Sequence, residues 1–146
     1  KSLFYNIFFA PFMLAIGFIP VEKGKPGSYH QGLAKLKTKL LDRDRAVLIF
    51  PETMRCPKGY PLLQKFSGAV FSLAIEAKAL IVPIAIRYTD KTWGRGDIWL
   101  TPFQPIELCI LSPVRADGYS DAQSLSQEVW HSLAKHIPPQ QEIRST

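Results

Sequence analysis

Two short, uninterrupted apolar runs constrain the fold of this 146-residue chain more than any other feature. The first run is residues 46–50 and the second is residues 80–86. Apolar runs of this length are typical of strands buried on both faces, as in a parallel sheet that helices cover on both sides. The second run contains Pro83, which has no N–H to donate and therefore belongs at a sheet edge or bulge.

Segments with a helical spacing of apolar residues alternate with these runs. The expected helices are residues 31–41, 68–79 and 120–137. The last of them opens with Ser120 and Gln123 in a pattern that resembles a capping box. Residues 97–103 and 106–111 are further strand candidates. This alternation predicts an α/β fold with a mainly parallel or mixed central sheet flanked by helices.

The N-terminal segment is strongly apolar. Residues 1–21 carry one charge, on Lys1, and 15 of the last 19 are apolar. A run of this length could cross a bilayer, but Pro11 and Pro20 interrupt a helix, and the six aromatic residues suit a membrane interface. We favour a kinked helix lying in or on the membrane over a buried core helix or a true span. An α/β body is expected at residues 22–146.

The positive charge of the chain is concentrated in one stretch. The net charge is +6, and residues 22–65 hold ten Lys and Arg against four Asp and Glu. An apolar segment followed by a basic block favours an anionic membrane surface as partner, whereas a nucleic-acid-binding domain more often intersperses basic and aromatic residues. We therefore expect no nucleic-acid partner. The two cysteines form no C-x-x-C pair, and we expect no metal site.

A charged loop follows the first apolar run. Glu52 and Arg55 come directly after the run ends at Phe50. Ligands of open α/β sheets bind at the carboxyl ends of strands, and Arg grips phosphates through two parallel hydrogen bonds. Glu52 could hold Arg55 in place or bind a substrate hydroxyl. A surface salt bridge within a turn is the alternative interpretation.

Four short segments stand in the order of the motifs of a known family. They are G-F-I-P-V-E-K at residues 17–23, F-P-E-T-M-R at 50–55, K-F-S-G-A at 65–69 and I-V-P-I at 81–84. They resemble the G-x-I-x-V-[DE]-R, F-P-E-G-T-R, F-K-x-G-A and I-V-P-V motifs of glycerolipid acyltransferases of the lysophosphatidate acyltransferase type. The resemblance covers roughly residues 1–90 and, more weakly, the rest of the chain.

The resemblance implies transfer of a fatty acyl group from an acyl-CoA or acyl carrier protein thioester to a hydroxyl of a lysophospholipid or glycerol phosphate. No cofactor besides this acyl donor, and no metal, is implied. Arg55 would bind the acceptor phosphate, and Lys23 would be a second phosphate ligand. Glu52, Thr53 and Lys65 complete the implied substrate-binding set. We expect the protein at the cytoplasmic face of a membrane, with lipid as its partner.

The sequence departs from this family in two places. The family's base is the His of an H-x-x-x-x-D motif, and none of the three histidines here has Asp at that spacing. The histidines are His30, His131 and His136. We therefore expect the catalytic pair upstream of Lys1, a single but N-terminally truncated domain at residues 1–146, and no activity from these residues alone. A non-catalytic relative that binds anionic lipid is the alternative.

The second departure is Thr53-Met54 in place of Gly-Thr. Glycine permits a positive φ and close approach of a ligand to the backbone, whereas Thr53 is stiff and Met54 is apolar and flexible. This change predicts an acceptor pocket that differs from that of the standard enzyme.

Overall fold

The structure is a computed structural model that describes residues 11, 15, 17–19, 27–42, 46–52, 63–93, 98–99 and 101–137. The chain divides into two compact units, Lys1–Leu48 and Ile49–Thr146. The second unit contains Glu52, Lys65 and every strand assigned among the described residues. The single domain at residues 1–146 stays a prediction.

The described part of the first unit is built on helix α2 (Ser28–Leu41), which confirms the expected helix at residues 31–41. Gly27 precedes α2 with a φ of 81°, a conformation that glycine adopts without strain. The Lys39 ammonium donates a hydrogen bond to the Gly17 carbonyl at 2.8 Å. The expected helical segment at residues 1–21 lies largely outside the described residues. Among those described, no helix has the length and apolarity needed to cross a membrane.

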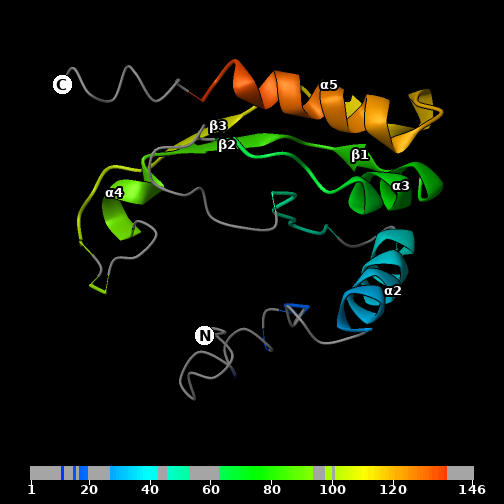
Figure 1. Cartoon of the computed structure of the whole chain (residues 1–146), viewed down its shortest axis with the longest axis horizontal. Coiled ribbons are helices and arrows are strands. Elements are labelled where there is room, and N and C mark those ends of the chain that lie inside the picture. The colour runs from blue at the N-terminus through cyan, green and yellow to red at the C-terminus, as the bar shows by residue number, and fades with distance from the viewer. Residues whose placement is uncertain are drawn as a thin grey trace. The chain divides into compact units, whose positions relative to one another are not determined.

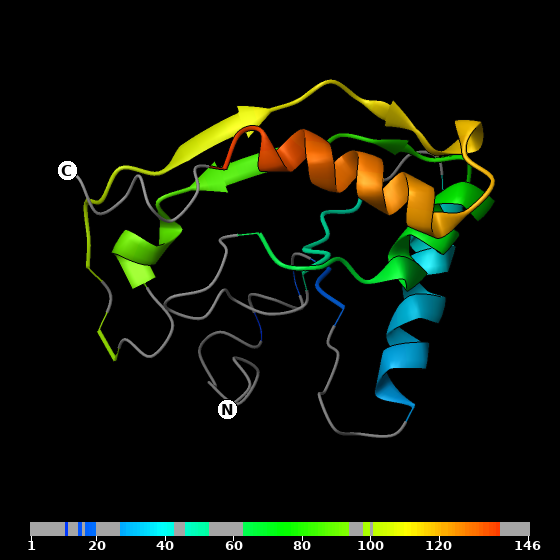
Figure 2. The same ribbon diagram turned by 45° about the horizontal axis from the view of Figure 1, so that its top comes forward.

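The second unit contains an antiparallel ribbon of four short strands (Figure 2). The strands are β1 (Leu80–Ile81), β2 (Ile84–Arg87), β3 (Glu107–Ile110) and β4 (Val114–Arg115). β1 pairs with β4, and β2 pairs with β3. Between the two pairs, Leu111 N donates to the Pro83 carbonyl at 2.9 Å. The gap holds residues 82–83 on one side and residues 111–113 on the other, so the extra residue lies in 111–113 and makes a bulge opposite Pro83. This position agrees with the expectation that Pro83 lies at a sheet edge or bulge.

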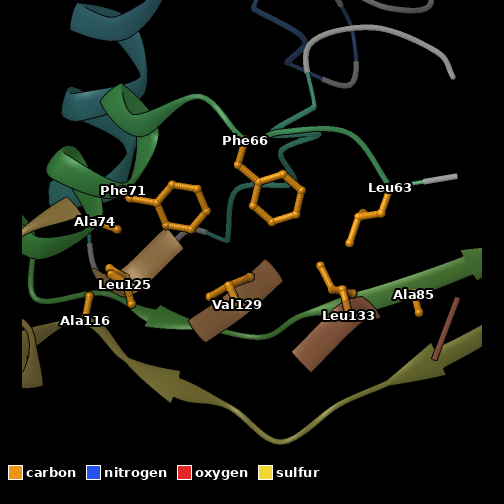
Figure 3. Close-up of a cluster of buried hydrophobic side chains, with 9 residues drawn as sticks. All are labelled: Leu63, Phe66, Phe71, Ala74, Ala85, Ala116, Leu125, Val129 and Leu133. Atoms are coloured by element: carbon orange, nitrogen blue, oxygen red, sulfur yellow. The ribbon is translucent and has the colours of Figure 1, made fainter. Parts of the chain in front are cut away.

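Two helices cover one face of this ribbon. They are α3 (Gly68–Glu76) and α5 (Ala122–Ala134), and α5 runs along the ribbon (Figure 1). Figure 3 shows Leu125, Val129 and Leu133 in a row along α5, where all three are buried. The Phe66 and Phe71 rings stack 5.9 Å apart between centroids within the same core. The helices predicted at residues 68–79 and 120–137 are therefore present, with shorter ends.

Two further helical turns connect these elements. Helix α4 (Thr89–Trp93) follows β2, and the 3-10 turn η2 (Ala116–Gly118) follows β4. Ala116 is fully buried in the core.

Among the residues that the structure describes, the ribbon is buried on one face only. The core face carries Ala85, which is 1% exposed, while the opposite face carries apolar side chains that are 37% to 72% exposed. These side chains are Leu80, Val82, Ile84, Leu108 and Ile110. The prediction that residues 80–86 are buried on both faces is wrong for the described structure, because its second unit supplies helices to one face.

Two expected strands are absent from the described chain. Residues 46–50 have no regular secondary structure, and Leu48 and Phe50 are 73% and 65% exposed. The described residues of the segment 97–103 form bends and turns. A strand needs a partner for its backbone N–H and C=O groups, and no described strand pairs with either segment. The mixed α/β class is observed, whereas the mainly parallel sheet is not confirmed because the described pairs are antiparallel.

Candidate functional site

The structure describes two of the five predicted substrate-binding residues. Lys23, Thr53 and Arg55 lie outside the described residues, and their roles stay predictions. Glu52 is half-buried and Lys65 is exposed, and both belong to the second unit.

The segment that carries Lys65 is tied to the start of the F-P-E-T-M-R motif by two hydrogen bonds. Glu52 Oε2 accepts from the Gln64 backbone N–H at 2.8 Å, and the Pro51 carbonyl accepts from the Ser67 N–H at 3.0 Å. Two motif segments that are separated in sequence are thereby joined. Lys65 directly follows the residue that Glu52 holds.

Burial sets the electrostatics of Glu52. Removal from water raises the pKa of its carboxyl above the ordinary value, and the hydrogen bond from Gln64 opposes that shift. One carboxylate oxygen is engaged by the main chain. This contact makes Glu52 a positioning residue for residues 64–67.

A groove lies between the start of α3 and one side of α5. It encloses about 740 Å³, with Leu63 and Phe66 in its apolar lining. Its polar lining includes Lys65 and Ser72 from the α3 side and Gln123, Gln127 and His131 from α5. The Trp130 indole also lines the groove, and its Nε1 donates to the Gln64 carbonyl at 3.1 Å. The Gln64 main chain is therefore held by Glu52 through its N–H and by Trp130 through its C=O.

His131 lies at the groove in a defined orientation. Its Nδ1 is 2.7 Å from the Gln127 carbonyl. A carbonyl only accepts, so Nδ1 carries the proton and Nε2 remains for another partner.

The residues of α5 were not predicted as site residues. Gln123, Gln127 and Trp130 follow one another at i, i+4 and i+7, which places them on one helical face beside the buried row. This spacing was the available sequence signal. It could not show that this face meets residues 63–68.

Nothing in the described ranges resembles a metal centre: no three His, Cys, Asp or Glu side chains lie together there. The absence of a cofactor and of a metal stays a prediction.

Comparisons with known proteins give one family match and several similar relatives. The family model "Acyltransferase" matches residues 1–87, more than half of the chain. The chain is 26% identical over 119 residues to the 1-acyl-sn-glycerol-3-phosphate acyltransferase alpha of Mus musculus, which covers 80% of this chain and 41% of the relative. A 1-acyl-sn-glycerol-3-phosphate acyltransferase of Pseudomonas aeruginosa is 29% identical over 149 residues, which cover 98% of this chain and 56% of the relative. A coconut (Cocos nucifera) enzyme of the same name is 22% identical over 123 residues, which cover 83% of this chain and 39% of the relative.

The chain spans about half the length of these curated relatives, or less. No solved structure gives a significant match. The family match includes the F-P-E-T-M-R segment and the residues that Glu52 and Pro51 hold. The chain therefore belongs to the acyltransferase family, in the group typified by the 1-acyl-glycerol-3-phosphate acyltransferases.

Proposed function

We propose that the protein containing this chain transfers a fatty acyl group from an acyl thioester, either acyl-CoA or acyl carrier protein, to the hydroxyl of 1-acyl-glycerol 3-phosphate or a related glycerol phosphate. The names of the relatives support this acceptor. The observation that carries the proposal is the pair of hydrogen bonds from residues 64 and 67 to Glu52 and Pro51, which joins two motif segments into one candidate site.

The proposed roles follow from charge and position. Arg55 binds the acceptor phosphate through paired, charge-assisted hydrogen bonds, and Lys23 and Lys65 add positive charge. Glu52 holds the segment that carries Lys65, and Thr53 lines the acceptor pocket. The base that takes the hydroxyl proton in this mechanism is a His oriented by an Asp. No H-x-x-x-x-D pair occurs in these 146 residues, so that pair would come from outside them.

The same proposal includes the membrane location of the protein and the arrangement of its central sheet. The 1–21 segment lies on the cytoplasmic face of a membrane. In the protein that contains this chain, the F-P-E-T-M-R loop lies at the carboxyl edge of a mainly parallel central sheet, where open α/β sheets bind ligands.

Acyl transfer by the protein that contains this chain tests the proposal. Arg55→Ala should raise the KM for the acceptor roughly tenfold or more, because a charge-assisted contact to phosphate is lost. Arg115→Ala is the control, since Arg115 is exposed and paired with Asp117 at 2.7 Å. An unchanged KM would refute the phosphate role of Arg55. If no acyl transfer occurs and salt-sensitive binding to anionic liposomes persists, the non-catalytic relative is the correct description.

A further inference from the structure

We propose that the groove between residues 63–68 and α5 binds the acceptor as a single-chain anionic amphiphile. In this arrangement Lys65 contacts the phosphate, and Leu63, Phe66 and Trp130 contact the aliphatic chain. The identity of the acceptor rests on the proposed function. The location of its binding site, and the part that α5 plays in it, rest on the geometry of the groove.

The charge of the groove favours an anion. Lys65 is exposed, and the described lining residues include no Asp or Glu. Gln123 and Gln127 add neutral amide donors along α5. The ring proton of His131 is held on Nδ1 by the Gln127 carbonyl, so neutral Nε2 is an acceptor and adds no donor for the phosphate. One cation among neutral donors suits a phosphate group.

The size and apolar lining of the groove indicate a ligand that is larger and more apolar than a free phosphate. A volume of about 740 Å³ lies within the range of roughly 300–1,000 Å³ that is typical of small-molecule sites. Leu63 and Phe66 are each 9% exposed, so they form an apolar floor at the edge of the core. An aliphatic chain covers such a floor, whereas a bare phosphate leaves it in contact with water.

The main chain that carries Lys65, which lines one wall of the groove, is held in place before a ligand binds. Trp130 donates to the Gln64 carbonyl at 3.1 Å, and Glu52 accepts from the Gln64 N–H at 2.8 Å. Lys65, the next residue, is therefore attached to a main chain held from both sides. A preformed wall reduces the ordering cost of binding.

Calorimetric titration of the 146-residue chain with hexanoyl-lysophosphatidate, whose short chain keeps it monomeric, tests the inference. Lys65→Met should weaken binding roughly tenfold or more, as expected for loss of a charge-assisted contact. Lys135→Met makes the same charge change at an exposed residue just after α5, outside the groove, and should leave binding within about twofold. Equal effects of the two variants would overturn the proposal.

A blocking variant tests the groove by its shape. Ser72 is exposed on α3 and lines the groove, so Ser72→Trp fills it from the surface and should abolish binding. Lys135→Trp is its control. If Ser72→Trp loses the helical circular dichroism of the parent, Gln127→Trp provides the same block from α5. Wild-type affinity in a folded blocking variant would overturn the proposal.

A series of ligands identifies which part of the lysophosphatidate, the phosphate or the aliphatic chain, the groove recognises. Glycerol 3-phosphate and hexanoylglycerol should each bind more weakly than hexanoyl-lysophosphatidate, because each lacks either the chain or the phosphate. Coenzyme A should not displace the lysolipid. Displacement by coenzyme A in a Lys65-dependent manner would reassign the groove to the acyl donor and overturn the proposal.

These outcomes are distinct from a failure of the proposed function. Groove-dependent binding without acyl transfer by the protein that contains this chain would contradict only the proposed catalysis. Acyl transfer that is unchanged by Ser72→Trp would contradict only the location assigned to the acceptor.

Discussion

At the scale of single residues, the Gln64 peptide group is the point at which the candidate site meets the core. Its N–H is bonded to Glu52 and its C=O to Trp130, two residues 78 positions apart in the printed sequence. The sequence indicated Glu52 through its place after an apolar run. It did not indicate that the carboxylate would bind the main chain beside Lys65, because that contact depends on where residues 63–67 return in space.

Glu52→Gln should remove one source of pH dependence from the free energy of unfolding. The pKa of Glu52 is raised in the folded state, so its stabilising contribution is complete below the unfolded-state pKa and is lost as pH rises through the folded-state pKa. Gln keeps an oxygen that accepts from Gln64 N–H and carries no charge. Urea unfolding from pH 4 to pH 8 should therefore show a smaller decline for Glu52→Gln than for the parent chain.

Glu52→Ala provides the comparison. It removes the acceptor as well as the charge, and loss of a hydrogen bond of this kind costs about 1 kcal/mol net. Equal stability of the Ala and Gln variants at neutral pH would show that the bond to Gln64 contributes nothing.

At the scale of elements, α5 was predicted correctly in its body and incorrectly at its start. Leu125, Val129 and Leu133 recur every four residues and are all buried. The cap is Asp121, not Ser120: its side chain accepts from the Ser124 N–H at 2.8 Å and from the Ser124 hydroxyl at 2.6 Å. Both residues are suitable caps by type, so only the backbone conformation of Asp121, with φ −141° and ψ 152°, decides between them.

Asp121→Ala should lower the melting temperature by a few degrees, whereas Ser120→Ala should change it little. The side-chain hydrogen bond from Ser124 is the largest cause that lowers the pKa of Asp121. The stabilisation by this carboxylate is therefore present above its unfolded-state pKa and lost as pH falls through the lowered folded-state pKa. Thermal unfolding at neutral and acidic pH measures both effects, and a larger effect of Ser120→Ala would restore the original prediction.

At the scale of the second unit, the core lies on one side of the antiparallel ribbon. Leu125 of α5 is fully buried against that side, while Leu108 on the opposite face is 66% exposed. Both are leucines in apolar patterns that look alike in the sequence. Their energetic contributions differ because, within the described part of the chain, helices α3 and α5 pack against one face and the other stays exposed.

Leu125→Ala should therefore cost about 2–5 kcal/mol of unfolding free energy, through lost burial and the cavity left behind. Leu108→Ala removes the same atoms from an exposed position and should change stability by roughly 0.5 kcal/mol or less. Chemical denaturation of the two variants provides the measurement. A comparable loss for Leu108→Ala would mean that the second face is also covered in solution.

The sequence by itself determined the mixed α/β class, helices at α2, α3 and α5, the strand at β3, and the interruption of strand pairing at Pro83. These features follow from local periodicity and from the missing N–H of proline. It also indicated the acyltransferase family through motif segments that include Glu52 and Lys65. Only the tertiary structure decided that the described strand pairs are antiparallel, that one face of the ribbon is covered, and that α5 contributes Trp130 and His131 to a groove beside Lys65. Strand direction, face coverage and groove formation depend on contacts between distant residues, and local periodicity carries no information about which segments meet.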